Sequence, residues 1–83
     1  MPVLAIADKD RIKESVCAIL ELESDEVTDS SLFKDDHGAD SLLAIEILAQ
    51  LERTFKIAID QSELERLVNL DGVYAVVAEA MAA

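Results

Sequence analysis

The clearest helical block in the pattern of apolar and polar positions runs from Asp40 to Phe55. At about 100° per residue, one stripe of this segment collects the apolar residues expected to face a core. These are Ala44, Ile47, Leu48, Leu51 and Phe55. Asp40 stands directly before the stripe and is the expected N-cap, because its carboxylate can accept a first-turn N–H. The pattern therefore predicts an amphipathic helix over this segment.

The opposite side of the same helix carries a second, smaller apolar strip where a surface helix is normally polar. The strip consists of Leu42, Ile45 and Ala49, and Glu46 and Glu52 lie beside it. An apolar centre with a charged rim is typical of a docking surface. The alternative is that a neighbouring short helix covers the strip.

Three further helices are expected. The first follows an N-cap at Asp8 and reaches about Leu22, with an apolar face formed by Ile12, Val16, Ile19 and Leu20. The third is short and begins with a capping-box pattern over residues 62–65, where Ser62 is followed three residues later by Glu65. The fourth begins after Asn69 or Asp71 and runs towards Met81, and its expected packing residues are Val73, Val76, Val77 and Ala80.

Residues 23–40 are polar and are expected to form a long loop that Val27, Leu32 and Phe33 hold against the core. A loop of this length in a small domain is often functional. The sum is an all-α fold, a four-helix bundle with a short third helix and a long loop between the first two helices. Residues 1–83 are expected to form a single domain.

Composition narrows the class of protein. The chain is 52% hydrophobic but only 4% aromatic, so aliphatic side chains must build the core. Its net charge of −11 disfavours binding to nucleic acid or to anionic membranes, and favours partners with basic patches. The N-terminus has a short apolar run without a preceding basic region, which is neither a signal peptide nor a membrane span. A cytoplasmic protein is expected.

Most of the chemically reactive residues offer no catalytic site. The single cysteine, Cys17, lies in a helical pattern and is expected to be a buried structural thiol. His37 is the only histidine and is expected to be solvated in the polar loop, so neither a triad nor a metal site is indicated. The loop lacks the order of acids that a calcium-binding loop requires. The chain is therefore not expected to be an enzyme.

Ser41 is the exception, because it follows the N-cap at the positive end of the strongest helix. Its hydroxyl is free of capping duty, and a helix N-terminus favours a bound anion. A phosphate ester on Ser41 would suit the position, and Gly38 and Ala39 leave room for a modifying enzyme. Phosphorylation by a kinase satisfies the same physics, and a plain interaction module in which Ser41 only starts the helix is a third interpretation.

The segment Gly38-Ala39-Asp40-Ser41-Leu42 resembles the motif of the acyl carrier protein family. The resemblance spans nearly the whole chain, and includes the "FKIAID" turn, the short third helix and the last helix after "NLDG". It implies that Ser41 carries 4′-phosphopantetheine, whose thiol holds acyl groups as thioesters. It also implies that Leu42, Ile45 and Ala49 form a recognition strip, and that the acids Asp40, Glu46 and Glu52 meet basic partner surfaces.

The partners implied by the resemblance are a phosphopantetheinyl transferase and pathway enzymes such as an acyltransferase or ligase and a ketosynthase. A monomeric, free-standing carrier is expected. Leu43 and Arg53 stand where fatty-acid carriers usually have acids, and Ile59-Asp60 replaces a frequent Ile-Pro. These departures favour polyketide or related specialised metabolism over fatty-acid synthesis. A peptidyl carrier is a further alternative, which the "GAD" sequence and the strong acidity disfavour.

Overall fold

The computed structural model describes residues 5–38 and 40–82, and every regular element in these two ranges is helical. The elements are listed in chain order: α1 (Ile6–Leu20), η1 (Ser24–Glu26), α2 (Phe33–His37), α3 (Ser41–Phe55), η2 (Gln61–Arg66) and α4 (Leu70–Ala82). The elements η1 and η2 are 3₁₀ helices. The expected four-helix bundle is confirmed, with α1, α3, η2 and α4 as its four members.

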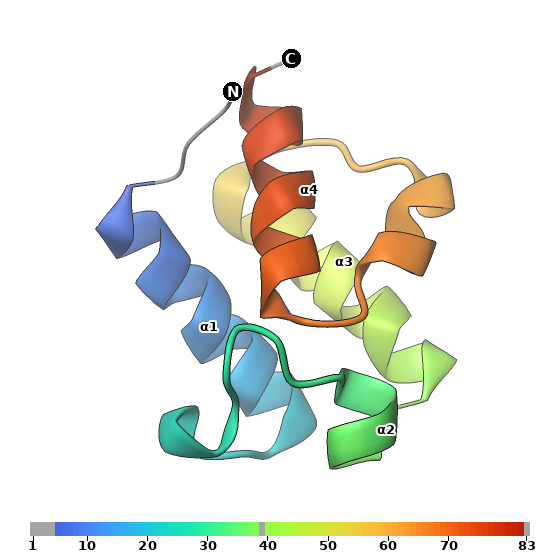
Figure 1. The fold of residues 1–83 in the computed structure, drawn as a ribbon. Helices are drawn as coiled ribbons and strands as arrows, with labels where there is room; N and C mark the ends of the chain where they lie inside the picture. Colours follow the sequence, from blue (N-terminus) through green and yellow to red (C-terminus); the bar gives the residue numbers. More distant parts are fainter. Residues whose placement is uncertain (1–4, 39, 83) are drawn as a thin grey trace.

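The core lies where α1, α3 and α4 pack against one another (Figure 1). Each of these helices contributes fully buried aliphatic side chains, among them Ile12, Val16, Ile47, Leu51, Val73 and Val77. The expected core stripe of α3 is therefore correct in its centre, while Ala44 and Phe55 at its two ends are only half-buried. Figure 1 shows η2 beside α3 and α4, on the side of the bundle away from α1.

The start and end of α1 differ from the sequence prediction. The helix begins at Ile6, so Asp8 lies in its first turn and is not the N-cap, and the Ala5 carbonyl accepts the N–H groups of Asp8 and Lys9. The apolar pattern did not predict this extra turn, because Ile6 is 80% exposed and does not face the core. At the other end, Glu21 adopts a left-handed conformation with φ of 57°, which stops the helix at Leu20 rather than near Leu22.

The segment between α1 and α3 was predicted to be a structureless loop, and this prediction was wrong. It contains η1 and α2, and Asp36 Oδ2 accepts the Leu32 N–H at 2.7 Å to close the start of α2. Val27 and Phe33 are buried as expected, whereas Leu32 is 37% exposed and does not hold the segment to the core. Helices of three and five residues are too short to show a hydrophobic period.

The segment is also tied to the far side of the bundle through its backbone. The Phe33 N–H donates to the Val68 carbonyl at 2.9 Å, and the Asp71 N–H donates to the Asp29 carbonyl at 3.0 Å. His37 lies in α2, where it is half-buried with Nε2 3.1 Å from Ser31 Oγ, so the expectation of a solvated loop histidine was wrong. These contacts position α2, the element that precedes Asp40 and α3 in the chain.

Candidate functional site

The candidate site is the start of α3, whose position depends on how α2 ends. Gly38 terminates α2 with φ of 70°, a left-handed conformation that few other residues adopt without strain. Its N–H donates to the Lys34 carbonyl at 3.0 Å. A Cβ at Gly38 would meet no atom within 4 Å, so this position needs glycine for its conformation rather than for space. Ala39, the next residue of the predicted motif, lies outside the described residues.

Asp40 is the N-cap of α3, as the sequence predicts. Its Oδ1 accepts the Leu43 N–H at 3.1 Å, and its carbonyl accepts the Ala44 N–H at 3.3 Å. Ser41 is then the first residue of a helix of fifteen residues. The partial positive charge of such a helix end favours a phosphate ester. Gly38, Asp40 and Leu42 are exposed, so the described residues on both sides of this position fit a bulky phosphate-linked group.

The second apolar strip of α3 is largely exposed. Leu42 is 68% exposed and Ile45 is 48% exposed, while Ala49 is half-buried. The alternative that the short third helix covers the strip does not hold, because η2 lies against the side of α3 that carries Ala44 and Ile47. An exposed apolar strip therefore begins beside Ser41 and continues along the helix.

The two acids predicted to rim this strip differ in their surroundings. Glu46 is exposed on α3, where it is available to a partner. Glu52 is half-buried, and its Oε2 accepts the Ile59 N–H at 3.0 Å, so this carboxylate also holds the segment that follows α3. Arg53 is exposed and donates to Gln50 Oε1 at 2.9 Å on the same helix. The face is thus acidic near Ser41 and carries both an acid, Glu52, and a base, Arg53, towards its far end.

A groove next to the start of α3 was not foreseen from the sequence. Its α3 side is formed by Asp40, Ala44 and Ile47, and its opposite wall by Leu64, Leu67 and Val68 at η2 and its end. Leu32 and Phe33 contribute to its lining from the segment before α3. The side chains lining both walls are mostly aliphatic, so the groove offers an apolar surface directly beside the N-cap of α3.

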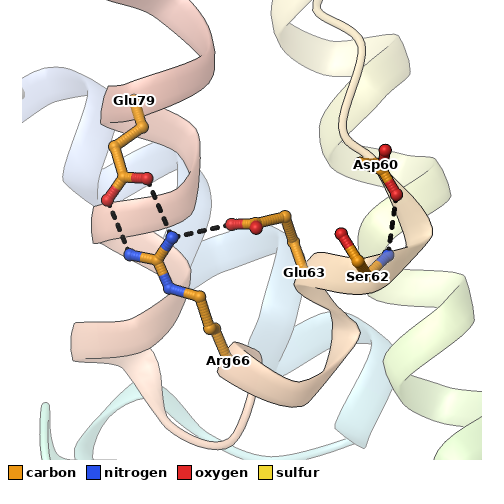
Figure 2. A network of polar contacts seen from close by, with 5 residues as sticks. All are labelled: Asp60, Ser62, Glu63, Arg66 and Glu79. Carbon is orange, nitrogen blue, oxygen red and sulfur yellow. Dashed lines mark hydrogen bonds and ion pairs between the residues drawn. The ribbon is translucent and has the colours of Figure 1, made fainter.

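The residue that caps η2 differs from the one that the capping-box pattern predicts. The cap is Asp60 rather than Ser62, because Asp60 Oδ1 accepts the Ser62 N–H at 2.9 Å (Figure 2). This hydrogen bond lowers the pKa of Asp60 below its ordinary value. The element begins one residue before the predicted box and forms a 3₁₀ helix. The start of α4 is as expected, since Asn69 Oδ1 accepts the Gly72 N–H at 2.8 Å.

Two other reactive groups lie in the packed body of the bundle. Cys17 is 5% exposed, as predicted, and burial raises the pKa of its thiol above the ordinary value. A protonated, buried thiol is a poor nucleophile. Burial and the nearby carboxylates of Asp29 and Asp10 raise the pKa of Tyr74 to about 12. Within residues 5–38 and 40–82, no group of three or more His, Cys, Asp or Glu side chains could hold a metal ion.

Comparisons with known proteins agree with this geometry. The family described as "Phosphopantetheine attachment site" matches residues 10–77 of the chain. The chain is also 66% identical over 77 residues to polyketide-8 synthase acyl carrier protein 1 of Streptomyces avermitilis, a match that covers 93% of this chain and 92% of the relative. The chain belongs to the acyl carrier protein family. Its members carry covalent 4′-phosphopantetheine, so the predicted family and cofactor are confirmed.

The chain is also similar to a second curated relative and to a chain of a solved structure. Polyketide-8 synthase acyl carrier protein 2 of the same organism is 37% identical over 67 residues, which cover 81% of the chain and 77% of that relative. A chain in a solved structure described as "The ishigamide ketosynthase/chain length factor" has a TM-score of 0.80 and 32% identity, and covers 95% of this chain. The match takes in 100% of that chain. In the described part of this carrier, no helix is both long and apolar enough to cross a membrane.

Proposed function

We propose that Ser41 is the attachment residue and that the protein carries acyl intermediates of polyketide biosynthesis in the cytoplasm. The observation that carries the proposal is the position of Ser41, which is the first residue of α3 directly after the Asp40 cap. Its location inside the family match, and the names of the two Streptomyces relatives, support the same conclusion. The protein itself would catalyse no step.

In the proposed modification, a transferase joins the Ser41 hydroxyl to the phosphopantetheinyl phosphorus of coenzyme A. The serine O–H loses its proton and one phosphoester bond forms, while the pyrophosphate bond of coenzyme A breaks and adenosine 3′,5′-bisphosphate leaves. When bound, the group supplies a terminal thiol that holds acyl groups as thioesters. Tethering raises the effective concentration of the acyl group at each enzyme that the carrier visits.

The contribution of the chain's own residues is to present that group to partners. Leu42, Ile45 and Ala49 would form the apolar centre of the docking face, and Asp40, Glu46 and Glu52 would attract a basic rim. A ketosynthase/chain length factor is the first partner we infer, from the likeness to a chain in a structure of that description. We expect this docking to be weak and electrostatically steered, so that a monomeric carrier can leave after each step.

Conversion of the wild-type protein tests the proposal. Incubation with coenzyme A and a broad-specificity phosphopantetheinyl transferase is expected to add the mass of one phosphopantetheine group. The modified protein should also gain one solvent-accessible thiol, because Cys17 is buried. A kinase switch would instead add a single phosphate on incubation with ATP, and a plain interaction module would add neither group.

An Ile45→Asp variant is expected to fold but to slow transfer onto Ser41, and acyl loading, by at least about tenfold. Folding should survive because Ile45 is 48% exposed, and docking should suffer because a charge in the apolar centre must be desolvated without a partner. Circular dichroism and initial rates of modification measure the two effects. Loss of helical structure in this variant would show that Ile45 belongs to the core and that the docking face is misassigned.

A Glu46→Lys variant is expected to weaken docking by a different route, which salt should reveal. Glu46 is exposed at the rim, so its charge acts mainly on the association rate. The Debye length falls from about 30 Å at 0.01 M salt to about 3 Å at 1 M, which screens such an interaction. The difference from wild type should therefore shrink with salt, while the Ile45→Asp defect persists. A salt-independent Glu46→Lys defect would argue against steering.

A further inference from the structure

The element η2 has little to hold it in place by its own structure. It is a 3₁₀ helix of six residues, a type with poorer hydrogen-bond geometry than an α-helix, and none of its residues is fully buried. Nevertheless it forms one wall of the groove beside the start of α3, through Leu64 and the adjoining Leu67 and Val68. The position of η2 relative to α3 therefore sets the width of that groove.

One side chain of η2 fastens it to α4. Arg66 Nη1 and Nη2 donate to the two carboxylate oxygens of Glu79 at 2.8 and 2.6 Å, and Nη1 also donates to Glu63 Oε2 at 2.7 Å (Figure 2). The hydrogen bonds from Arg66 lower the pKa of Glu79, so this carboxylate stays ionised below its ordinary range. A paired, two-oxygen contact of this kind is more specific in geometry than a single ion pair.

The backbone of the same residue makes a second close contact with α4. A Cβ placed on Gly72 would lie 2.0 Å from the Arg66 carbonyl oxygen, so only glycine permits the approach. Gly72 lies in the first turn of α4, and Glu79 lies two turns further along the same helix. Arg66 thus meets α4 at two separated points, which fixes both the position and the tilt of η2.

We propose that the Arg66–Glu79 pair is a latch that holds η2 to α4 and thereby sets how readily the groove beside Ser41 widens to admit an apolar guest. Arg66 is a positioning residue in this account, because its side chain reaches α4 and does not line the groove, and it acts through Leu64 and Leu67. The guest that we infer is the acyl group attached at Ser41, and only this identity rests on the proposed function. The latch itself is a property of the unmodified protein.

Hydrogen exchange in the unmodified chain tests the latch, with Arg66→Gln compared with Arg53→Gln. Both variants remove one arginine charge, but the side-chain contact of Arg53 stays within α3. Arg66→Gln is expected to speed exchange of the Glu63 and Leu67 amides by about two- to fivefold. This is the change in the opening equilibrium that loss of an exposed ion pair typically causes. Arg53→Gln should leave these amides unchanged, and the α1 amides of Ile12 and Val16 should respond to neither substitution.

An Arg66→Lys variant separates the paired geometry from the charge alone. Lysine keeps the charge but cannot match both Glu79 oxygens in a fixed fork, so exchange at η2 should fall between wild type and Arg66→Gln.

Titration with 1-octanol, followed through the NMR signals of Ala44 and Leu64, gives the second readout. Arg66→Gln should bind octanol about two- to fivefold more tightly than wild type, and Arg53→Gln should bind as wild type does.

Equal η2 exchange in wild type and Arg66→Gln would overturn the latch, and so would equal octanol affinity. An increase spread evenly over α1 and η2 would also contradict it, because it would show general destabilisation rather than local opening. None of these readouts uses the Ser41 modification. Failure of Ser41 to accept phosphopantetheine would overturn the proposed function and the identity of the guest, and would leave the latch result to stand by itself.

Discussion

A Ser41→Ala variant is expected to fold normally and to accept no phosphopantetheine from coenzyme A and a broad-specificity transferase. Alanine is well tolerated in the first turn of a helix, and the cap from Asp40 Oδ1 to the Leu43 N–H does not involve the Ser41 hydroxyl. The free energy of unfolding should therefore stay within about 0.5 kcal/mol of wild type. Intact mass and denaturant titration of the same sample measure the two effects together.

The control for this variant is Ser62→Ala. Ser62 lies in η2, where its backbone N–H donates to Asp60, a contact that alanine keeps, so this variant should be modified at the wild-type rate. Modification of Ser41→Ala would contradict the assignment directly. An unmodified Ser41→Ala protein that had also lost its circular dichroism signal would contradict the expectation that the hydroxyl has no structural role.

A Leu51→Ala variant is expected to lose about 2–5 kcal/mol of its free energy of unfolding. Leu51 is 0% exposed in the centre of the core-facing stripe of α3, so truncation removes buried methyl groups and leaves a cavity between the helices. In a chain of this size that loss is a large part of the total stability, so a fraction of the variant is expected to be unfolded at room temperature. Urea titration followed by circular dichroism measures it.

The matched control is Leu42→Ala, the same substitution on the same helix. Leu42 is 68% exposed, so its truncation should cost less than about 1 kcal/mol. The difference between the two losses in free energy of unfolding shows which face of α3 is turned towards the core. A cost below about 1 kcal/mol for Leu51→Ala, or similar costs for both variants, would show that the two faces of the helix are wrongly assigned.

The helical period of the sequence predicted the parts of the fold that depend on long apolar stripes. Residues 41–55 are helical as expected, with Asp40 as the cap and with Ile47 and Leu51 inside. This succeeded because a helix of four turns repeats its core-facing pattern several times. The exposed strip beside it was also predictable, because Leu42 and Ile45 break the polar pattern of the outer face.

The elements that escaped prediction are short or are held by single contacts. The five residues of α2 depend on buried Phe33 and on one Asp36 hydrogen bond, neither of which leaves a periodic signal. The cap of η2 is Asp60 rather than the predicted Ser62, and the Ser62 N–H is the group that Asp60 caps. Capping patterns fix where a helix begins only to within a residue or two.

The groove and the Arg66–Glu79 pair could not be predicted from the sequence, for a different reason. They join residues far apart in the chain, such as Ala44 with Leu64, and Arg66 with Glu79. A spacing of three residues between Glu63 and Arg66 indicates one local ion pair, and it was the only available signal. Gly72 gave no signal of its own, because its role depends on the approach of the Arg66 carbonyl from a separate element.

Fragmentation mass spectrometry of the modified wild-type protein tests the central claim most directly. After incubation with coenzyme A and the transferase, peptides that span residues 38–45 should carry one phosphopantetheine group, with fragment ions that place it on Ser41. Peptides that contain Ser30, Ser31 or Ser62 should remain unmodified. A group on any of those three serines, or a wild-type protein that gains no mass under these conditions, would contradict the account.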